Sequence, residues 1–254
     1  NLFWQTFMFF LLYFYTDVFG ITGAAAGTMF LVARIWDTIN DPLMGIIADR
    51  TKTRWGKFRP YILWFAIPFG VIGFLTFTTP DFSEAGKLVY AYITYTLMMM
   101  IYTGINIPYS ALMGVLSSNS QERTAVSSMR FIAAFIGGII VQASAKPLVN
   151  FFGNGNEQLG WQMAIGCYAL LAIALWFITL FSTKEQEQPT RKQQTNIKND
   201  IKDLFNNGPW VFLFIIGIFL LTFVSMRNGV IMYYFKYYVE GQSFGLFGRI
   251  FEFQ

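Results

Sequence analysis

The chain has 254 residues, of which 55% are hydrophobic, 19% aromatic and only 13% charged. Soluble domains carry about 25% charged residues, so this composition, with a mean hydropathy of +0.46, excludes an ordinary soluble globule. It also excludes a disordered chain, which has few aromatic residues and many charges. The sequence has no histidine and one cysteine, Cys167, which excludes a disulfide framework and a zinc or iron–sulfur site. The composition predicts an all-α polytopic membrane protein.

Seven apolar stretches fit membrane-spanning helices, each of which needs about 20 residues to cross the hydrocarbon core. In chain order they are 2–18, 23–48, 60–78, 88–116, 126–149, 161–181 and 210–238. The polar segment between the sixth and seventh is rich in Gln, Lys, Asn and Glu, which is typical of a solvated loop. We therefore predict a six-helix bundle at 1–181, a central loop at 182–208, and the start of a second bundle, with a seventh helix, at 209–254.

Neither end of the sequence has the features expected of a natural terminus. Asn1 lies inside an apolar run, without an initiator methionine or a charged segment before it, so no signal peptide is expected. The tail, 241–254, completes no further span. We expect the chain to be part of a longer protein.

Lysine and arginine gather in alternate loops. The loops after the second, fourth and sixth spans hold eleven of them, and the opposite loops hold only Lys87. The eleven are Arg50, Lys52, Arg54, Lys57, Arg59, Arg123, Lys184, Arg191, Lys192, Lys198 and Lys202. Such a bias marks the cytoplasmic side of a membrane protein, so the central loop is expected in the cytoplasm. Topology explains these charges more simply than a nucleic-acid partner, and none is expected.

The second span carries charges that a lipid-facing helix does not tolerate. Arg34, Asp37 and Asp41 cost about 2.5–3.5 kcal/mol each at mid-helix, roughly 9 kcal/mol together. Their spacings of three and four place them on one helix face, with Asn40 beside them. Two carboxylates and an amide form an oxygen cluster of the kind that a hard cation prefers, so the sequence predicts a site for Na⁺, Li⁺ or H⁺. The alternative is a salt bridge from Arg34 that only pins helices together.

The fourth and fifth spans carry a second polar group. Thr103, Asn106 and Ser110 recur at spacings of three and four. Tyr102 and Tyr109 lie among them, and this pattern of polar and aromatic groups suits a sugar. The alternative is hydrogen bonding between helices. Arg130, inside the fifth span, is expected to pair with the aspartates, hold a substrate or extend toward the cytoplasm. Arg227 in the seventh span has the same alternatives.

A signature follows the second span. It runs Asp41-Pro42-x2-Gly45-x3-Asp49-Arg50-x3-Arg54-x-Gly56-Lys57-x-Arg59-Pro60. This resembles the loop between the second and third helices of the major facilitator superfamily. Together with residues 33–41, it resembles the glycoside-pentoside-hexuronide:cation symporter family. The resemblance continues in Tyr15-Thr16-Asp17-Val18, Ile107-Pro108, Arg130-Phe131 and Tyr233-Tyr234-Phe235.

The resemblance implies a bacterial inner-membrane carrier of twelve helices in two bundles, of which this chain holds the first bundle and helix seven. It implies cation-coupled sugar symport, with a sugar, a monovalent cation and the lipid bilayer as partners, and no cofactor beyond the coupling cation. The implied cation ligands are Asp37, Asn40, Asp41 and Thr103, and Arg130 is implied at the sugar site. The implied gating residues are Arg34, Gly45, Asp49, Arg50, Arg54, Lys57 and Arg59.

Three positions depart from the family pattern at the sugar site. Asn106 and Asn1 stand where carboxylates are expected, and Ser110 replaces a tryptophan. Asn1, Asn106, Tyr109, Ser110 and Arg130 are therefore the candidate substrate residues. A less acidic pocket favours other glycosides or a hexuronide, whose carboxylate would bind Arg130 or Arg227.

Two other functions match parts of the sequence. Gly45-x3-Asp49 matches the end of the signature of intramembrane CDP-alcohol phosphotransferases. The next required Asp is Thr53 and the leading motif is missing, so no enzyme is expected. A lipid or amphiphile carrier of the same superfamily is the stronger rival, because 29 Phe and 13 Tyr residues could line an amphipathic pocket.

Overall fold

The computed structural model describes residues 2–117, 119–185, 205–238, 242–246 and 249–253. The chain separates into two compact units. The first comprises Asn1–Phe7 and Leu11–Gln188, and the second comprises Met8–Phe10 and Pro189–Gln254. Asn1 and the segment 186–204, with four of the basic residues expected in the central loop, lie outside the described residues. The domain boundaries expected at 181 and 208 remain predictions.

Each expected span of the first bundle is helical. The elements are α1 (Leu2–Tyr13), the π-helix η1 (Phe14–Phe19), α2 (Gly23–Arg50), α3 (Arg59–Thr76), α4 (Glu84–Val115), α5 (Ser120–Gly153) and α6 (Glu157–Ser182). Several helices begin at a side chain that accepts a hydrogen bond from the first turn, among them Thr22 before α2 and Ser83 before α4. At the capped starts of α4, α5 and α6 the helix therefore begins before the apolar stretch.

The second unit contains α8 (Gly208–Tyr237), which Asn207 caps. After it come two antiparallel strands, β1 (Gln242–Leu246) and β2 (Arg249–Phe253), with Gln242 opposite Phe253. The expected seventh helix is thus present. The sequence pattern did not predict the hairpin, since it indicated only that the tail completes no span.

Five helices of the described chain are long and apolar enough to cross a membrane. They are α3, α4, α5, α6 and the Gly208–Ile231 part of α8. At 12 residues α1 is too short by itself, although η1 continues it, and the polar residues of α2 lower its hydropathy. The chain is an integral membrane protein in which α2 carries the densest group of charges within an expected span.

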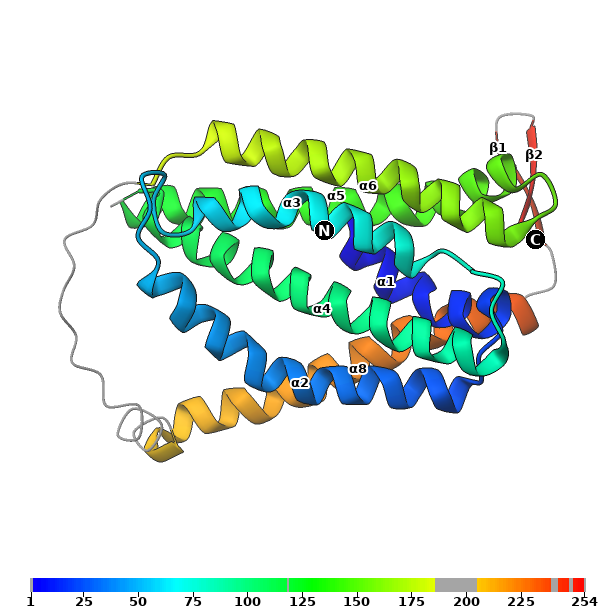
Figure 1. The fold of residues 1–254 in the computed structure, drawn as a ribbon, viewed down its shortest axis with the longest axis horizontal. Helices are drawn as coiled ribbons and strands as arrows, with labels where there is room; N and C mark the ends of the chain where they lie inside the picture. The colour runs from blue at the N-terminus through cyan, green and yellow to red at the C-terminus, as the bar shows by residue number, and fades with distance from the viewer. Residues whose placement is uncertain (1, 118, 186–204, 239–241, 247–248, 254) are drawn as a thin grey trace. The chain divides into compact units, whose positions relative to one another are not determined.

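In the first unit, α3 packs against both α4 and α6, while α2 packs against α4 and α5 packs against α6 (Figure 1). A buried cluster closes the end that carries the α2–α3 loop. Its members are Ala48, Phe58, Tyr61, Ile62, Leu112 and Leu180. This packing sets α2 against α4, and α1, α3, α4, α5 and α6 together line a hollow.

Candidate cation and substrate site

The predicted cation ligands of α2 and α4 meet at one hydrogen bond. Thr103 Oγ1 of α4 donates to Asp41 Oδ1 of α2 over 2.8 Å, although 62 residues separate them. Thr103 is buried, with 5% of its surface exposed, and Asp41 is half-buried. A buried hydroxyl oxygen beside a carboxylate offers two oxygen ligands from two helices.

Asp37 lies one turn earlier on the same face. Its Oδ2 is 3.4 Å from Nη1 of Arg34, and the Asp37 side chain is 13% exposed against 50% for Arg34. Asp37 Oδ1 is buried without a hydrogen-bond partner in the described structure. An unpaired buried carboxylate oxygen is costly, and a cation or proton would remove that cost.

The geometry of the Arg34–Asp37 ion pair argues against the alternative that these charges only hold helices together. Arg34 and Asp37 belong to the same helix, so their pair joins no two helices. The pair also leaves Asp37 Oδ1 and the Thr103–Asp41 contact unexplained. Asn40 is half-buried on α2, and its role as a ligand remains a prediction.

A cavity of about 150 Å³ lies between α1, α3, α4, α5 and α6. Its lining is mainly aromatic, with one positive charge. The lining residues are Phe3, Trp4, Phe69, Tyr102, Asn106, Tyr109, Arg130, Ala172, Leu175, Trp176 and Thr179. Three of the candidate substrate residues, Asn106, Tyr109 and Arg130, are therefore brought together. Asn1 lies outside the described residues.

Arg130 contacts α4 rather than the aspartates of α2. Its guanidinium carbon is 5.0 Å from the centroid of the Tyr109 ring. Its Nη2 is 3.5 Å from Ser110 Oγ, and its Nη1 is 3.5 Å from Met113 Sδ. Among the described residues these neighbours are a ring, a hydroxyl and a thioether, with no carboxylate. The guanidinium therefore keeps donors for an anionic or hydroxylated ligand.

The cavity includes aromatic residues that sequence reasoning did not select. Trp4 stacks on Tyr102 at 5.0 Å between centroids and 15° between planes, and Trp176 meets Tyr109 edge-on. Such rings suit the apolar faces of a sugar. Trp4 lies in an apolar run, so no sequence signal separates it from an ordinary packing residue.

The α2–α3 loop, where most of the gating residues are expected, is tied to the end of α6. Glu185 accepts hydrogen bonds from the backbone N–H groups of Lys57, Phe58 and Arg59 at 2.7, 2.8 and 2.9 Å. The Arg59 guanidinium donates to the carbonyl of Leu180 at 2.8 Å. Sequence reasoning missed Glu185, which follows the sixth span and gives no local signal.

Other predicted gating residues lie near the end of α2 or in the same loop. Asp49 and Arg50 are exposed in the last turn of α2, and the Arg54 guanidinium lies 4.8 Å from the Trp55 ring centroid. Gly45 was expected to permit close helix approach. A Cβ there would be 3.9 Å from Ile107, an ordinary contact, so close packing does not require this glycine.

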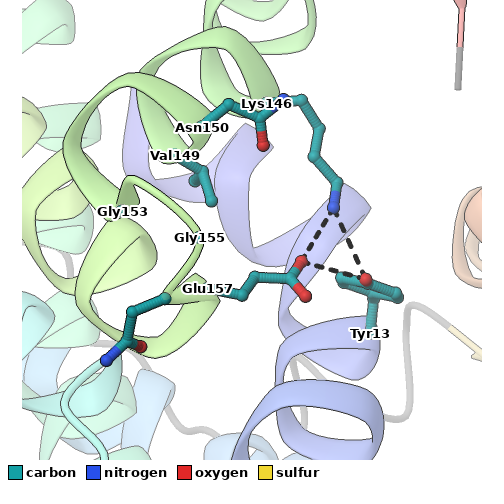
Figure 2. Close-up of a pocket in the computed structure, with 8 residues that line it drawn as sticks. Tyr13, Lys146, Val149, Asn150, Gly153, Gly155 and Glu157 are labelled. Carbon is teal, nitrogen blue, oxygen red and sulfur yellow. Dashed lines mark hydrogen bonds and ion pairs between the residues drawn. The ribbon is translucent and has the colours of Figure 1, made fainter.

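A second hollow, of about 230 Å³, lies at the opposite end of the bundle. Lys146, Glu157 and Tyr13 point toward one another there (Figure 2). Glu157 Oε1 accepts from Lys146 Nζ at 2.9 Å and from Tyr13 Oη at 3.0 Å. Because these polar groups bind one another, the cluster ties α1, α5 and α6 together and is a weaker candidate site than the aromatic cavity.

Comparison with known proteins decides the family. The chain matches the MFS/sugar transport protein family over residues 1–247. It belongs to this family. The resemblance to glycoside-pentoside-hexuronide:cation symporters is confirmed, and the enzyme alternative is set aside because the family consists of transporters.

Curated relatives of the family agree with this assignment. YagG of Escherichia coli strain K12, named as a candidate glycoside/cation symporter, is 41% identical over 93% of this chain and 52% of its own length. Inner membrane symporter YicJ of the same strain is 43% identical over 89% of this chain and 49% of its own. The isoprimeverose transporter of Lactiplantibacillus pentosus is 42% identical over 94% and 50%. The chain thus spans about half the length of these relatives.

Proposed function

We propose that the complete carrier is a secondary active transporter that moves a glycoside, pentoside or hexuronide together with a monovalent cation. The observation that carries this proposal is the bond from Thr103 to Asp41. It sets the acidic face of α2 against α4, the helix that also supplies Tyr102, Asn106 and Tyr109 to the aromatic cavity. A cation at the aspartates and a sugar in the cavity would then share one helix.

The proposed cation is Na⁺, with Li⁺ and H⁺ as alternatives. Asp37, Asn40, Asp41 and Thr103 would supply its oxygen ligands. Binding would neutralise carboxylates that repel each other and would satisfy the unpaired Asp37 Oδ1. An inward membrane potential would add about 2.3 kcal/mol per charge per 100 mV to the driving force.

Transport would proceed by alternating access in the inner membrane, with the basic loops in the cytoplasm. Cation and sugar would each raise the affinity for the other by the same factor, because coupling between two binding sites is reciprocal. The α2–α3 loop would form part of the cytoplasmic gate. Its basic residues, Arg50 to Arg59, would pair with acidic partners on the second bundle.

The substrate proposal rests on Arg130. Its guanidinium is the cavity's one charged lining group among the described residues, and it has no carboxylate neighbour there. Asn106 stands where a carboxylate was expected. A sugar with a carboxylate of its own would complete this arrangement, whereas neutral glycosides would use the aromatic faces and Asn106. Uptake limited to neutral galactosides would contradict a preference for hexuronides.

The test is uptake of labelled glycosides, pentosides and hexuronides, isoprimeverose among them, into vesicles that carry the complete protein. Each sugar is measured with an inward Na⁺ gradient, with a proton gradient, and with neither. We expect one gradient to drive accumulation, and Asp41→Asn to reduce it to equilibration. If no sugar responds to either gradient while detergent-like amphiphiles bind, the protein is an amphiphile carrier of the same superfamily.

A further inference from the structure

We propose that Trp4 couples the cation cluster to the sugar cavity, acting through Arg34. This inference rests on the proposed symport function and concerns how its two sites communicate. Coupling requires an element whose position both ligands influence. Trp4 lines the cavity and also contacts Arg34, which is the ion-pair partner of the predicted cation ligand Asp37.

On the cation side, one guanidinium contacts both Trp4 and Asp37. The Arg34 guanidinium carbon is 5.4 Å from the centroid of the Trp4 ring, within the range of a cation–π interaction. Nη1 of the same side chain is 3.4 Å from Asp37 Oδ2. The Arg34 side chain is half-exposed, so neither interaction holds the guanidinium firmly. A ligand that takes the Asp37 carboxylate would therefore leave Trp4 as the remaining partner of the guanidinium.

On the sugar side, Trp4 stacks on Tyr102 and both rings line the cavity. Tyr102 immediately precedes Thr103, whose hydroxyl binds Asp41. The indole of Trp4 therefore packs on α4, the helix that carries the Thr103 hydroxyl. The position of the indole depends on its contact with Arg34 and on its contact with α4.

A sequence of events follows from these contacts. A cation bound at Asp37 competes with Arg34 for the carboxylate and frees the guanidinium to lie over Trp4. The indole is then held against Tyr102, and the fixed Trp4–Tyr102 pair forms one part of the cavity wall that a sugar contacts. By reciprocity, a sugar that fixes the indole keeps Arg34 away from Asp37 and so favours the cation.

The test measures sugar binding to the complete carrier with saturating NaCl and with choline chloride. The probes are isoprimeverose and p-nitrophenyl-β-D-glucuronide, and the ratio of the two Kd values is the coupling factor. A wild-type factor of roughly 5 to 150 is typical of coupled sites. We expect Trp4→Ala to bring this factor to about 1, and Trp4→Phe to leave an intermediate value, because a phenyl ring binds cations less well than indole.

The matched control is Trp176→Phe. Trp176 lines the same cavity but meets Tyr109 rather than Arg34. We expect it to weaken sugar binding and to keep the coupling factor. A readout without sugar is the change in tryptophan fluorescence on titration with NaCl, which should disappear in Trp4→Phe and persist in Trp176→Phe.

The outcomes separate the inference from the function on which it rests. A coupled wild type whose factor and Na⁺-dependent fluorescence survive in both Trp4 variants overturns the role of Trp4 alone. If the wild-type carrier has a coupling factor of 1 and its fluorescence does not respond to Na⁺, both cation coupling and this inference are overturned. If Trp4→Ala binds no sugar, the Na⁺-dependent fluorescence change of Trp4→Phe becomes the test: its loss supports the role of Trp4, and its persistence overturns that role.

Discussion

At the scale of single residues, Thr103 is the side chain that links the charged face of α2 to α4 and so extends the proposed cation site to a second helix. Asp37 and Asp41 are neighbours on α2 by helical spacing alone. Only the hydroxyl of Thr103, donating to Asp41 Oδ1 at 2.8 Å, brings in a ligand from α4. The affinity of the proposed cation site should therefore depend on this hydroxyl as well as on the carboxylates.

We expect Thr103→Val to weaken Na⁺ binding by roughly tenfold to a hundredfold while the protein stays folded. The substitution keeps the shape of the side chain and removes a hydroxyl bonded to a charged group, an interaction worth about 1.5–3 kcal/mol. The measurement is the Na⁺ concentration that gives half-maximal fluorescence change or half-maximal sugar binding.

The control for this prediction is Thr94→Val on the same helix. Thr94 is also buried, but its hydroxyl donates to the backbone carbonyl of Tyr90 in its own helix. Its replacement should leave Na⁺ affinity unchanged. Equal losses in the two variants would mean that Thr103 acts through packing of α4 and not as a ligand.

At the scale of elements, the start of α3 depends on a residue beyond the end of α6. Three successive N–H groups, from Lys57 to Arg59, donate to the carboxylate of Glu185. The free N–H groups and the dipole of a helix N-terminus favour a negative charge there. Gly56 lies just before, at a φ of +108°, and a Cβ on it would overlap the Glu185 carboxylate. The α2–α3 loop is thus shaped around this carboxylate.

Glu185→Ala should lower the stability of the complete carrier by about 0.5–2 kcal/mol, the usual effect of losing a helix cap. The same change should increase the proteolytic sensitivity of the α2–α3 loop. The measurements are the apparent thermal unfolding midpoint in detergent and limited proteolysis. The exposed neighbour provides a control, because Lys184→Ala should change neither.

A double variant tests whether Glu185 acts on this loop. Gly56→Ala alone should destabilise through both backbone strain and overlap with Glu185. Combined with Glu185→Ala, the overlap disappears, so the double variant should lose less stability than the two single losses added together. Strict additivity would show that the two residues do not interact.

At the scale of the whole molecule, alternating loops should lie on opposite sides of the membrane. The loop between α2 and α3 carries basic residues from Lys52 to Lys57, whereas the loop between α3 and α4 carries none. Basic loops are retained in the cytoplasm. The hollow formed by Lys146 and Glu157 lies at the end away from the basic loop, so the proposed orientation would place it on the outer side of the membrane.

Cysteine labelling checks this orientation. In a Cys167→Ser background, because Cys167 is exposed, Asp81→Cys should react with a membrane-impermeant maleimide in intact cells. Lys52→Cys should react only after the membrane is permeabilised. The reverse pattern would contradict the proposed topology, and with it the placement of the gate on the cytoplasmic side.

The sequence by itself determined the elements and the features that lie within one helix. Hydropathy located each expected span of the first bundle, and α8, because the thickness of the bilayer fixes the length of an apolar helix. The period of the helix places Arg34, Asp37 and Asp41 on one face, whatever the other helices do. The family, too, was evident from the residues of the α2–α3 loop, and the match over residues 1–247 confirmed it.

The family resemblance already groups Thr103 with the aspartates of α2, but the tertiary structure alone decided which contacts join the helices. It joined Thr103 to Asp41 and turned Arg130 toward Tyr109 instead of the aspartates. It also placed Trp4 against Arg34 and Glu185 against the start of α3. In a membrane the lipid-facing and helix-facing sides are both apolar, so hydropathy does not specify how each helix is rotated about its axis. Contacts between residues far apart in the chain depend on those rotations, which the packing of the bundle fixes.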